Sequence, residues 1–207
     1  MVEVRPHLAA VLVALALIVV RASPIAAQAS LSVRAGVGSF TGGDFSGTPP
    51  GPTVGGAYHI PLDDLTEATL GIDYSRYGEN GFVGATTQVD YAASVLRRLR
   101  PKSPEVLGGV RMGYSTRSLS IVDEPARTDG YLVGPTLSLR AAPTALGGAS
   151  LDLSVDVLYH AYEELIMYAS REYGTDQDGF RAVVRLGLLI PVPFLTDPDE
   201  EASPGGW

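Results

Sequence analysis

Apolar and polar residues alternate along most of the chain beyond residue 30. In residues 151–160, LDLSVDVLYH, the apolar side chains occupy the odd positions. Asp152, Ser154 and Asp156 occupy even positions, with Leu158 as the exception. A strand sends alternate side chains to opposite faces, whereas a helix would spread these carboxylates around its circumference. The segment is therefore predicted to be a β-strand with one apolar and one polar face.

The same alternation recurs between turn-forming residues and predicts further strands. Together they make eight amphipathic strands with almost no helical pattern, which is typical of an all-β antiparallel barrel or sandwich. The predicted strands are residues 31–40, 53–60, 66–77, 85–99, 105–115, 131–141, 151–160 and 180–194.

The connections between these strands alternate in length. Short connections follow the second, fourth and sixth strands, and longer polar ones follow the first, fifth and seventh. A membrane barrel has short periplasmic turns, longer outer loops and both termini on the periplasmic side. We therefore predict an eight-stranded antiparallel up-and-down transmembrane barrel over residues 30–194.

The N-terminal residues have the pattern of a secretory signal peptide. Arg5 precedes an unbroken apolar run at residues 8–20, and small residues follow it up to Ala29. This run would rise only about 20 Å as a helix, less than the roughly 30 Å of a hydrocarbon core. We predict a signal peptide at residues 1–29, with export to the outer membrane of a diderm bacterium.

The composition of the polar face indicates which way it points. It combines arginines and carboxylates with glycine and serine, whereas a solvated outer face more usually carries lysine and glutamate. The interior of eight strands is just wide enough for side chains to fill it. We therefore expect the following residues inside a plugged lumen, with charges paired: Arg34, Glu67, Asp73, Asp90, Arg111, Arg140, Asp152, Asp156, Arg181 and Arg185.

Five aromatic residues share the apolar face of their strands near the predicted outer ends. Aromatic rings at that position form a girdle at the level of the lipid headgroups. The expected girdle comprises Tyr74, Tyr114, Tyr131, Tyr159 and Phe180.

The pattern over residues 31–194 resembles the small outer-membrane β-barrel family that includes the OmpA- and OmpX-like eight-stranded barrels. Such barrels usually end in an aromatic residue that the insertion machinery reads, and GFRAVVRLGLLIPVPF ends in Phe194. This chain departs from the pattern by continuing through residues 195–207, an acidic tail that we expect to be disordered in the periplasm.

Motifs of catalysis and cofactor binding do not occur in the sequence. There is no HExxH, GxSxG, CxxC or GxxxxGK[ST], and no cysteine. With a net charge of −8 and Lys102 as the only lysine, the chain is not expected to bind nucleic acid. We predict that the protein is not an enzyme and has no catalytic residue, cofactor or metal site.

One histidine is a candidate for a catalytic role. His160 lies near Glu163 and Glu164, but Ser154 on the same face is about 20 Å away along a strand. A serine on a neighbouring strand stays open, and a hydrogen-bonding lumen or rim histidine is the preferred interpretation. The acidic residues of the loops are interpreted as solvated charge: Asp44, Glu79, Asp123, Glu124, Asp129, Glu163, Glu164, Glu172, Asp176 and Asp178.

The sequence therefore predicts a monomeric outer-membrane barrel with a structural, adhesive or interaction role through its outer loops. Its expected partners are outer-membrane lipid, lipopolysaccharide and the barrel-assembly machinery. Two alternatives stay open. One is a soluble periplasmic lipocalin-like barrel that holds an apolar ligand, and the other is an outer-membrane lipid-modifying enzyme.

Overall fold

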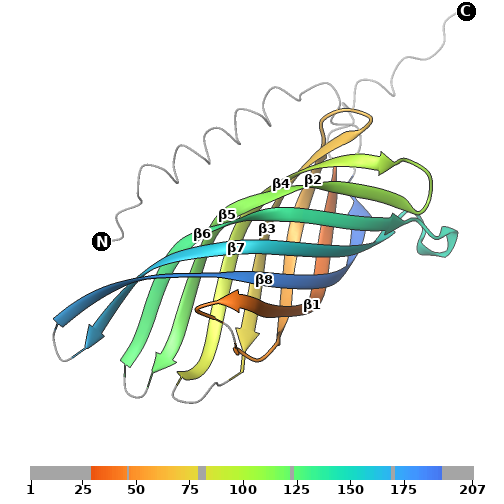
Figure 1. Ribbon diagram of the computed structural model, residues 1–207. Coiled ribbons are helices and arrows are strands. Elements are labelled where there is room, and N and C mark those ends of the chain that lie inside the picture. The colour runs from red at the N-terminus through yellow and green to blue at the C-terminus, as the bar shows by residue number, and fades with distance from the viewer. Residues whose placement is uncertain (1–28, 46, 79–82, 122–123, 169–170, 193–207) are drawn as a thin grey trace, which may run out of the picture.

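The computed structural model describes residues 29–45, 47–78, 83–121, 124–168 and 171–192. Eight antiparallel strands follow one another around a closed barrel, and β1 pairs with β8 to close it (Figure 1). The elements are β1 (Ser30–Gly43), β2 (Gly51–Pro61), β3 (Thr66–Tyr77), β4 (Val83–Arg100), β5 (Glu105–Ile121), β6 (Glu124–Ala141), the 3₁₀ turn η2 (Thr144–Leu146), β7 (Ser150–Tyr168) and β8 (Arg171–Pro191).

The two ends of the barrel differ. At one end, here named the terminal end, Ser30 pairs with Pro191 and the Val192 N–H donates to the Ala29 carbonyl at 2.9 Å. The connections 62–65, 101–104 and 142–149 lie at the same end. The opposite end, named the ribbon end, carries the other four connections, and β5 to β8 extend there as long hairpins (Figure 1).

The stagger of the strands sets the width of the barrel. Following the paired residues from Ser30 across β2 to β8 leads back to β1 at Phe40, ten residues further along. For eight strands this stagger corresponds to a strand tilt of about 40° and an interior that side chains can fill. The residues that face inward therefore meet across the lumen.

The expected fold is confirmed, but several strand bounds are corrected. The predicted polar loops at residues 116–130 and 161–179 are instead the ends of β5, β6, β7 and β8. The predicted difference in loop length is therefore wrong, since connection 142–149 is longer than the gaps 122–123 and 169–170. The last strand ends at Pro191 rather than 194. Residues 1–28 of the predicted signal peptide, Phe194 and the tail lie outside the described residues.

The polarity of the barrel is inverted relative to a soluble protein. Leu153, Val155 and Leu186 on the outer face are 42%, 37% and 58% exposed. Asp152 and Arg185 on the inner face are 9% and 2% exposed. A continuous apolar exterior around a charged interior is the arrangement of a transmembrane barrel. The alternative of a lipocalin-like barrel is wrong, because an apolar ligand needs an apolar interior.

The apolar exterior carries a ring of aromatic side chains. All five residues of the predicted girdle lie on the outer face, and Tyr91, which the prediction left out, joins them. Tyr91 pairs with Tyr114, and Tyr114 pairs with Tyr131. The rings of Tyr159 and Phe180 lie 5.5 Å apart. After correction for the stagger of the sheet, the heights of the six residues along the barrel axis differ by about three residues at most.

The distance from this aromatic ring to the terminal end matches a membrane. About nine residues of strand separate the two levels. At 3.3 Å per residue and a strand tilt of about 40°, this corresponds to about 23 Å along the barrel axis. Transmembrane barrels present an apolar band of about 25 Å flanked by aromatic residues. Among the described residues, the structure contains no helix long and apolar enough to span a membrane.

Candidate functional site

All ten charged residues that the sequence assigns to the lumen are buried inside the barrel. Each lies on the inward parity of its strand, so side chains from different strands meet inside the barrel. Leu158, the exception to the alternation, also points inward and packs with Ala92 and Leu132 in a small apolar cluster. The lumen is therefore a packed, mainly polar core with apolar clusters inside it.

The middle of the lumen is a network built around Asp73. Arg34 binds this carboxylate with two hydrogen bonds of 2.8 Å, and Arg111 donates a third at 2.5 Å. Arg185 lies 3.7 Å from Asp73 and is hydrogen bonded to Asp156. Buried charges are tolerated when each is paired and hydrogen bonded, as these are. The network connects β1, β3, β5, β7 and β8 across the lumen.

Glycines on the inner face leave room for these long side chains. A Cβ at Gly71 would lie 2.7 Å from an Arg34 nitrogen, and one at Gly55 would lie 2.2 Å from Asp73 Oδ1. Any larger residue at either position would push the ion pair apart. At these two positions, glycine is explained by close approach to charged groups.

A second polar layer lies nearer the ribbon end. Arg181 donates to Asp90 at 2.5 Å and to Ser75 at 2.6 Å. Asp90 also accepts hydrogen bonds from Gln88 and Ser115 at 2.7 and 2.6 Å. Arg181 is fully buried, and its guanidinium lies 5.5 Å from the centre of the Tyr77 ring.

An aromatic cluster closes the lumen above this layer. Phe45, in the connection after β1, is buried with its ring 4.9 Å from Phe40 and 5.5 Å from Tyr162. The Arg117 guanidinium lies over the Phe45 ring at 4.1 Å, within cation–π range. Tyr77 completes the cluster. The connection after β1 therefore turns a side chain into the barrel and covers its mouth.

The third polar layer lies at the terminal end. Arg140 holds both oxygens of Glu67 with hydrogen bonds of 2.8 and 2.9 Å. His59 Nδ1 lies 3.1 Å from Glu67 Oε1, and His59 Nε2 lies 2.9 Å from Ser32 Oγ. All four side chains are buried. Because an ionised carboxylate can only accept, His59 Nδ1 carries a proton. The Ser32 hydroxyl lies within hydrogen-bond distance of both His59 Nε2 and the Ala57 carbonyl oxygen, the latter at 3.4 Å.

A cavity of about 230 Å³ opens beside this third layer at the terminal end. It is bounded by groups of both charges and by several hydroxyls. Arg140 Nε and Arg98 Nε are buried without a hydrogen-bond partner, and both residues border the cavity. The lining also includes His59, Glu67 and Ser30.

This terminal-end cluster was missed from the sequence, although each member lies on the polar face of its strand. Ser32, His59 and Glu67 belong to β1, β2 and β3, which are consecutive in the chain and adjacent in the barrel. The sequence feature that could have revealed it is the presence of a serine, a histidine and a glutamate on the polar faces of three successive strands, each near the terminal end. What the sequence did not supply was the register that aligns them.

The histidine singled out from the sequence has different surroundings. His160 is fully buried, with Nδ1 3.0 Å from the Tyr162 hydroxyl and the two rings stacked. The structure shows no serine hydrogen bonded to it in the described part of the chain, and Ser154 lies deeper in the lumen. His160 is the hydrogen-bonding lumen histidine that the sequence favoured. The side chains of Glu163 and Glu164 lie outside the described residues.

The acidic residues assigned to loops are only partly described. The Asp178 N–H donates to Asp44 Oδ2 at 3.0 Å, which ties the start of the connection after β1 to β8. Within the described ranges, no group of histidine and carboxylate side chains could hold a metal ion.

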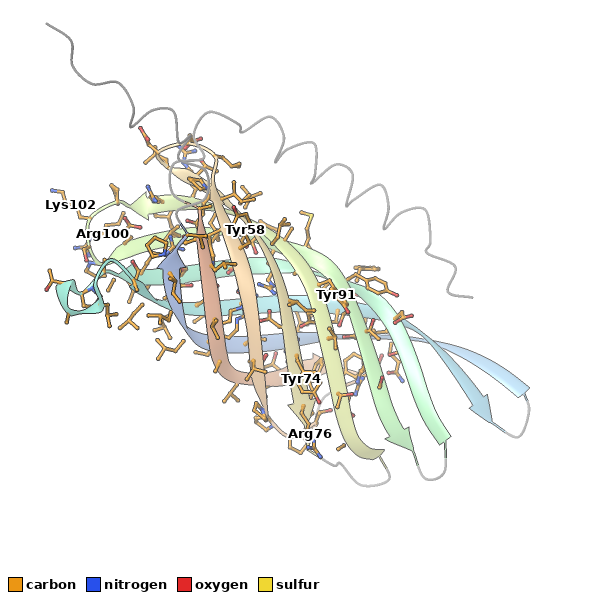
Figure 2. The ribbon with its side chains drawn as sticks, turned by 180° about the vertical axis from the view of Figure 1, so that it is seen from behind. Tyr58, Tyr74, Arg76, Tyr91, Arg100 and Lys102 are labelled. Atoms are coloured by element: carbon orange, nitrogen blue, oxygen red, sulfur yellow. The ribbon has the colours of Figure 1, made fainter. Side chains whose placement is uncertain are left out.

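Basic residues gather at the terminal end, on and after β4. Arg97 and Arg100 are exposed there, together with Lys102 in the following turn. Figure 2 shows Arg100 and Lys102 at the end of the barrel opposite Tyr74 and Arg76. Leu99, between the two arginines, is among the most exposed apolar residues. The barrel therefore has a basic rim on one side of its terminal end.

Comparison with known proteins finds similarity only among solved structures. No family model and no curated protein matches the chain. Neisserial surface protein A is 12% identical with a TM-score of 0.47, covering 80% of this chain and 97% of that one. Ail, the attachment invasion locus protein of Yersinia pestis, is 13% identical with a TM-score of 0.45, covering 79% and 99%. The N-terminal barrel domain of Pseudomonas aeruginosa OprF is 14% identical with a TM-score of 0.44, covering 78% and 97%.

Proposed function

We propose that the protein is a plugged outer-membrane barrel whose structural or interaction role is performed by the strands beyond its aromatic ring. The observation that carries this proposal is the inverted polarity, with apolar side chains outside and paired charges inside. Strands of this kind span the outer membranes of diderm bacteria, with termini in the periplasm. The terminal end then faces the periplasm and the ribbon end faces outward.

The filled lumen favours interaction over transport. Three polar layers and the Phe45 cluster follow one another along the axis, and their charged groups are bonded to one another. An eight-stranded interior occupied in this way offers no continuous aqueous path. We therefore expect no porin activity.

The outer ends of β5 to β8 supply the interaction surface in this proposal. Both hairpins continue past the aromatic ring toward the ribbon end (Figure 1).

Arg76, exposed just beyond Tyr74, is placed to meet lipopolysaccharide phosphates. We further propose a monomer, inserted by the barrel-assembly machinery.

Membrane fractionation with heat-modifiable gel mobility tests the proposal. The full chain is expected in the outer-membrane fraction, with an unboiled band that migrates differently from the boiled one because the closed sheet resists detergent. Recovery of the folded chain in the soluble periplasmic fraction would contradict the proposal.

Conductance in planar bilayers tests the plugged lumen separately. The folded chain is expected to give no large unitary steps. Regular openings of porin size would show that the charge layers leave a path, even if the membrane location held.

A further inference from the structure

The layer at the terminal end has the arrangement of a nucleophilic centre. His59 stands between a hydroxyl and a carboxylate, with Nε2 2.9 Å from Ser32 Oγ and Nδ1 3.1 Å from Glu67 Oε1. In serine hydrolases the same order of contacts lets the histidine remove the hydroxyl proton, while the carboxylate fixes the tautomer and orientation of the ring. Such centres are recognised by geometry, whatever the fold or chain order.

The carboxylate is itself held in place, which an orienting group requires. Arg140 donates to both Glu67 oxygens, so the carboxylate cannot rotate away from the imidazole. Glu67 Oε1 accepts from both Arg140 and His59. Glu67 and Arg140 are positioning residues in this arrangement, because they act through His59.

The neighbouring cavity gives the centre room for a small molecule. Its volume of about 230 Å³ is that of a short ligand rather than a lipid with long acyl chains. His59 and Glu67 line it, and so does Ser30, two residues before Ser32 on the same face of β1. Ser32 itself is buried and does not line the cavity, so His59 is the member of the centre that connects the two. Arg98 and Arg140 line it as well, with Arg140 bound to Glu67 and Arg98 3.6 Å from Glu105, so the cavity wall is polar and carries paired charges.

We propose that Ser32, His59 and Glu67 form a hydrolytic centre at the periplasmic mouth of the barrel that acts on small carboxylic esters. This activity is separate from the interaction role proposed above. It also revises the expectation from sequence that the protein has no catalytic residue, and it uses a different histidine and a different substrate class from the lipid-modifying alternative.

The reaction runs in two balanced steps. Ser32 Oγ attacks the ester carbonyl carbon while His59 Nε2 takes the hydroxyl proton. The bond from that carbon to the alkoxy oxygen then breaks, the proton passes to the leaving alcohol, and an acyl-serine remains. Water adds to the acyl carbon and gives its proton to His59. The acid then leaves, and Ser32 Oγ regains a proton from the imidazole.

Covalent labelling of the folded full chain tests the centre directly. A fluorophosphonate probe reacts with activated serines, so we expect an adduct that peptide mass spectrometry locates on Ser32. The same preparation, in detergent micelles, is expected to hydrolyse p-nitrophenyl acetate. Ser32→Ala and His59→Ala should each lower the hydrolysis rate at least about a hundredfold and abolish the adduct.

Matched variants separate chemistry from folding. Ser154→Ala and His160→Ala change the same residue types elsewhere in the lumen and should leave labelling and hydrolysis intact. Glu67→Asp should retain more activity than Glu67→Gln, because a shorter carboxylate can still orient the imidazole. Heat-modifiable mobility confirms that each variant is folded.

Two results would overturn the inference. One is a folded wild-type chain that takes no label on Ser32, and the other is a folded Ser32→Ala variant that hydrolyses the ester as fast as the wild type. Neither result would affect the proposed membrane location, which fractionation tests independently.

Discussion

At the scale of single residues, the lumen depends on each charge having a partner. Asp73 carries the largest share of this pairing, because Arg34 and Arg111 both donate to it and Arg185 lies within 4 Å. Removing one member of a buried ion network leaves the others desolvated and unpaired, which costs more than the bond itself contributes. The network therefore concentrates stability in a few side chains.

Replacing Asp73 with Asn should destabilise the barrel strongly. It leaves Arg34 and Arg111 facing a neutral amide, with Asp156 as the remaining carboxylate for three arginines, and we expect the free energy of unfolding to fall by about 3–5 kcal/mol. Urea unfolding in lipid vesicles measures the change. Asp63→Asn, in the exposed connection after β2, is the control and should cost less than about 0.5 kcal/mol. An unchanged midpoint for Asp73→Asn would show that the network contributes little.

A charge on the outer face should have a comparable effect for a different reason. Val155→Arg places a guanidinium against lipid in the middle of the apolar band, at a cost of about 2–4 kcal/mol. We expect less folded protein in vesicle refolding followed by gel mobility. Val155→Leu keeps the face apolar and should refold like the wild type. Equal yields for arginine and leucine would argue that this face does not contact lipid.

At the scale of elements, strand length and the connection after β1 were the features that sequence predicted least well. Alternation ends near residues 115 and 160, yet β5 and β7 continue to Ile121 and Tyr168. Beyond the membrane, neither lipid nor a filled lumen imposes opposite polarity on the two faces of a strand. The alternation of apolar and polar residues therefore ends there, while the backbone hydrogen bonds between the strands continue. Within the bilayer the same period located all eight strands.

Phe45 tests the role of the connection after β1. Phe45→Ala removes a buried ring that contacts Phe40, Tyr162 and Arg117, and should lower stability by about 3 kcal/mol. Bilayer conductance should nevertheless stay low, because the layer of Arg181 and Asp90 lies beneath. Phe180→Ala, on the outer face, is the matched control and should cost less. Large conductance steps in Phe45→Ala would identify this cluster as the only barrier.

At the scale of the whole molecule, the apolar band determines which bilayers suit the barrel. Its height of about 23 Å is shorter than the roughly 30 Å of an average hydrocarbon core. A barrel shorter than its bilayer must thin the lipid around it, at a modest cost for each ångström.

Refolding should therefore depend on acyl-chain length. We expect a higher folded yield and a higher urea midpoint in vesicles of twelve-carbon phosphatidylcholine than in vesicles of eighteen-carbon phosphatidylcholine, because the mismatch is smaller. Gel mobility and circular dichroism follow the unfolding transition. A preference for the thicker bilayer would mean that the band extends past the aromatic ring.

The sequence by itself determined the number of strands, the face on which each side chain lies and the inversion of polarity, because alternation follows from local backbone geometry. It placed Asp152 and Arg185 inside and Leu153 outside, as found. Only the tertiary structure decided the partners: Arg34 with Asp73, Arg140 with Glu67, and Ser32 with His59. These pairs depend on register and closure, which join residues far apart in the chain and which no local pattern encodes.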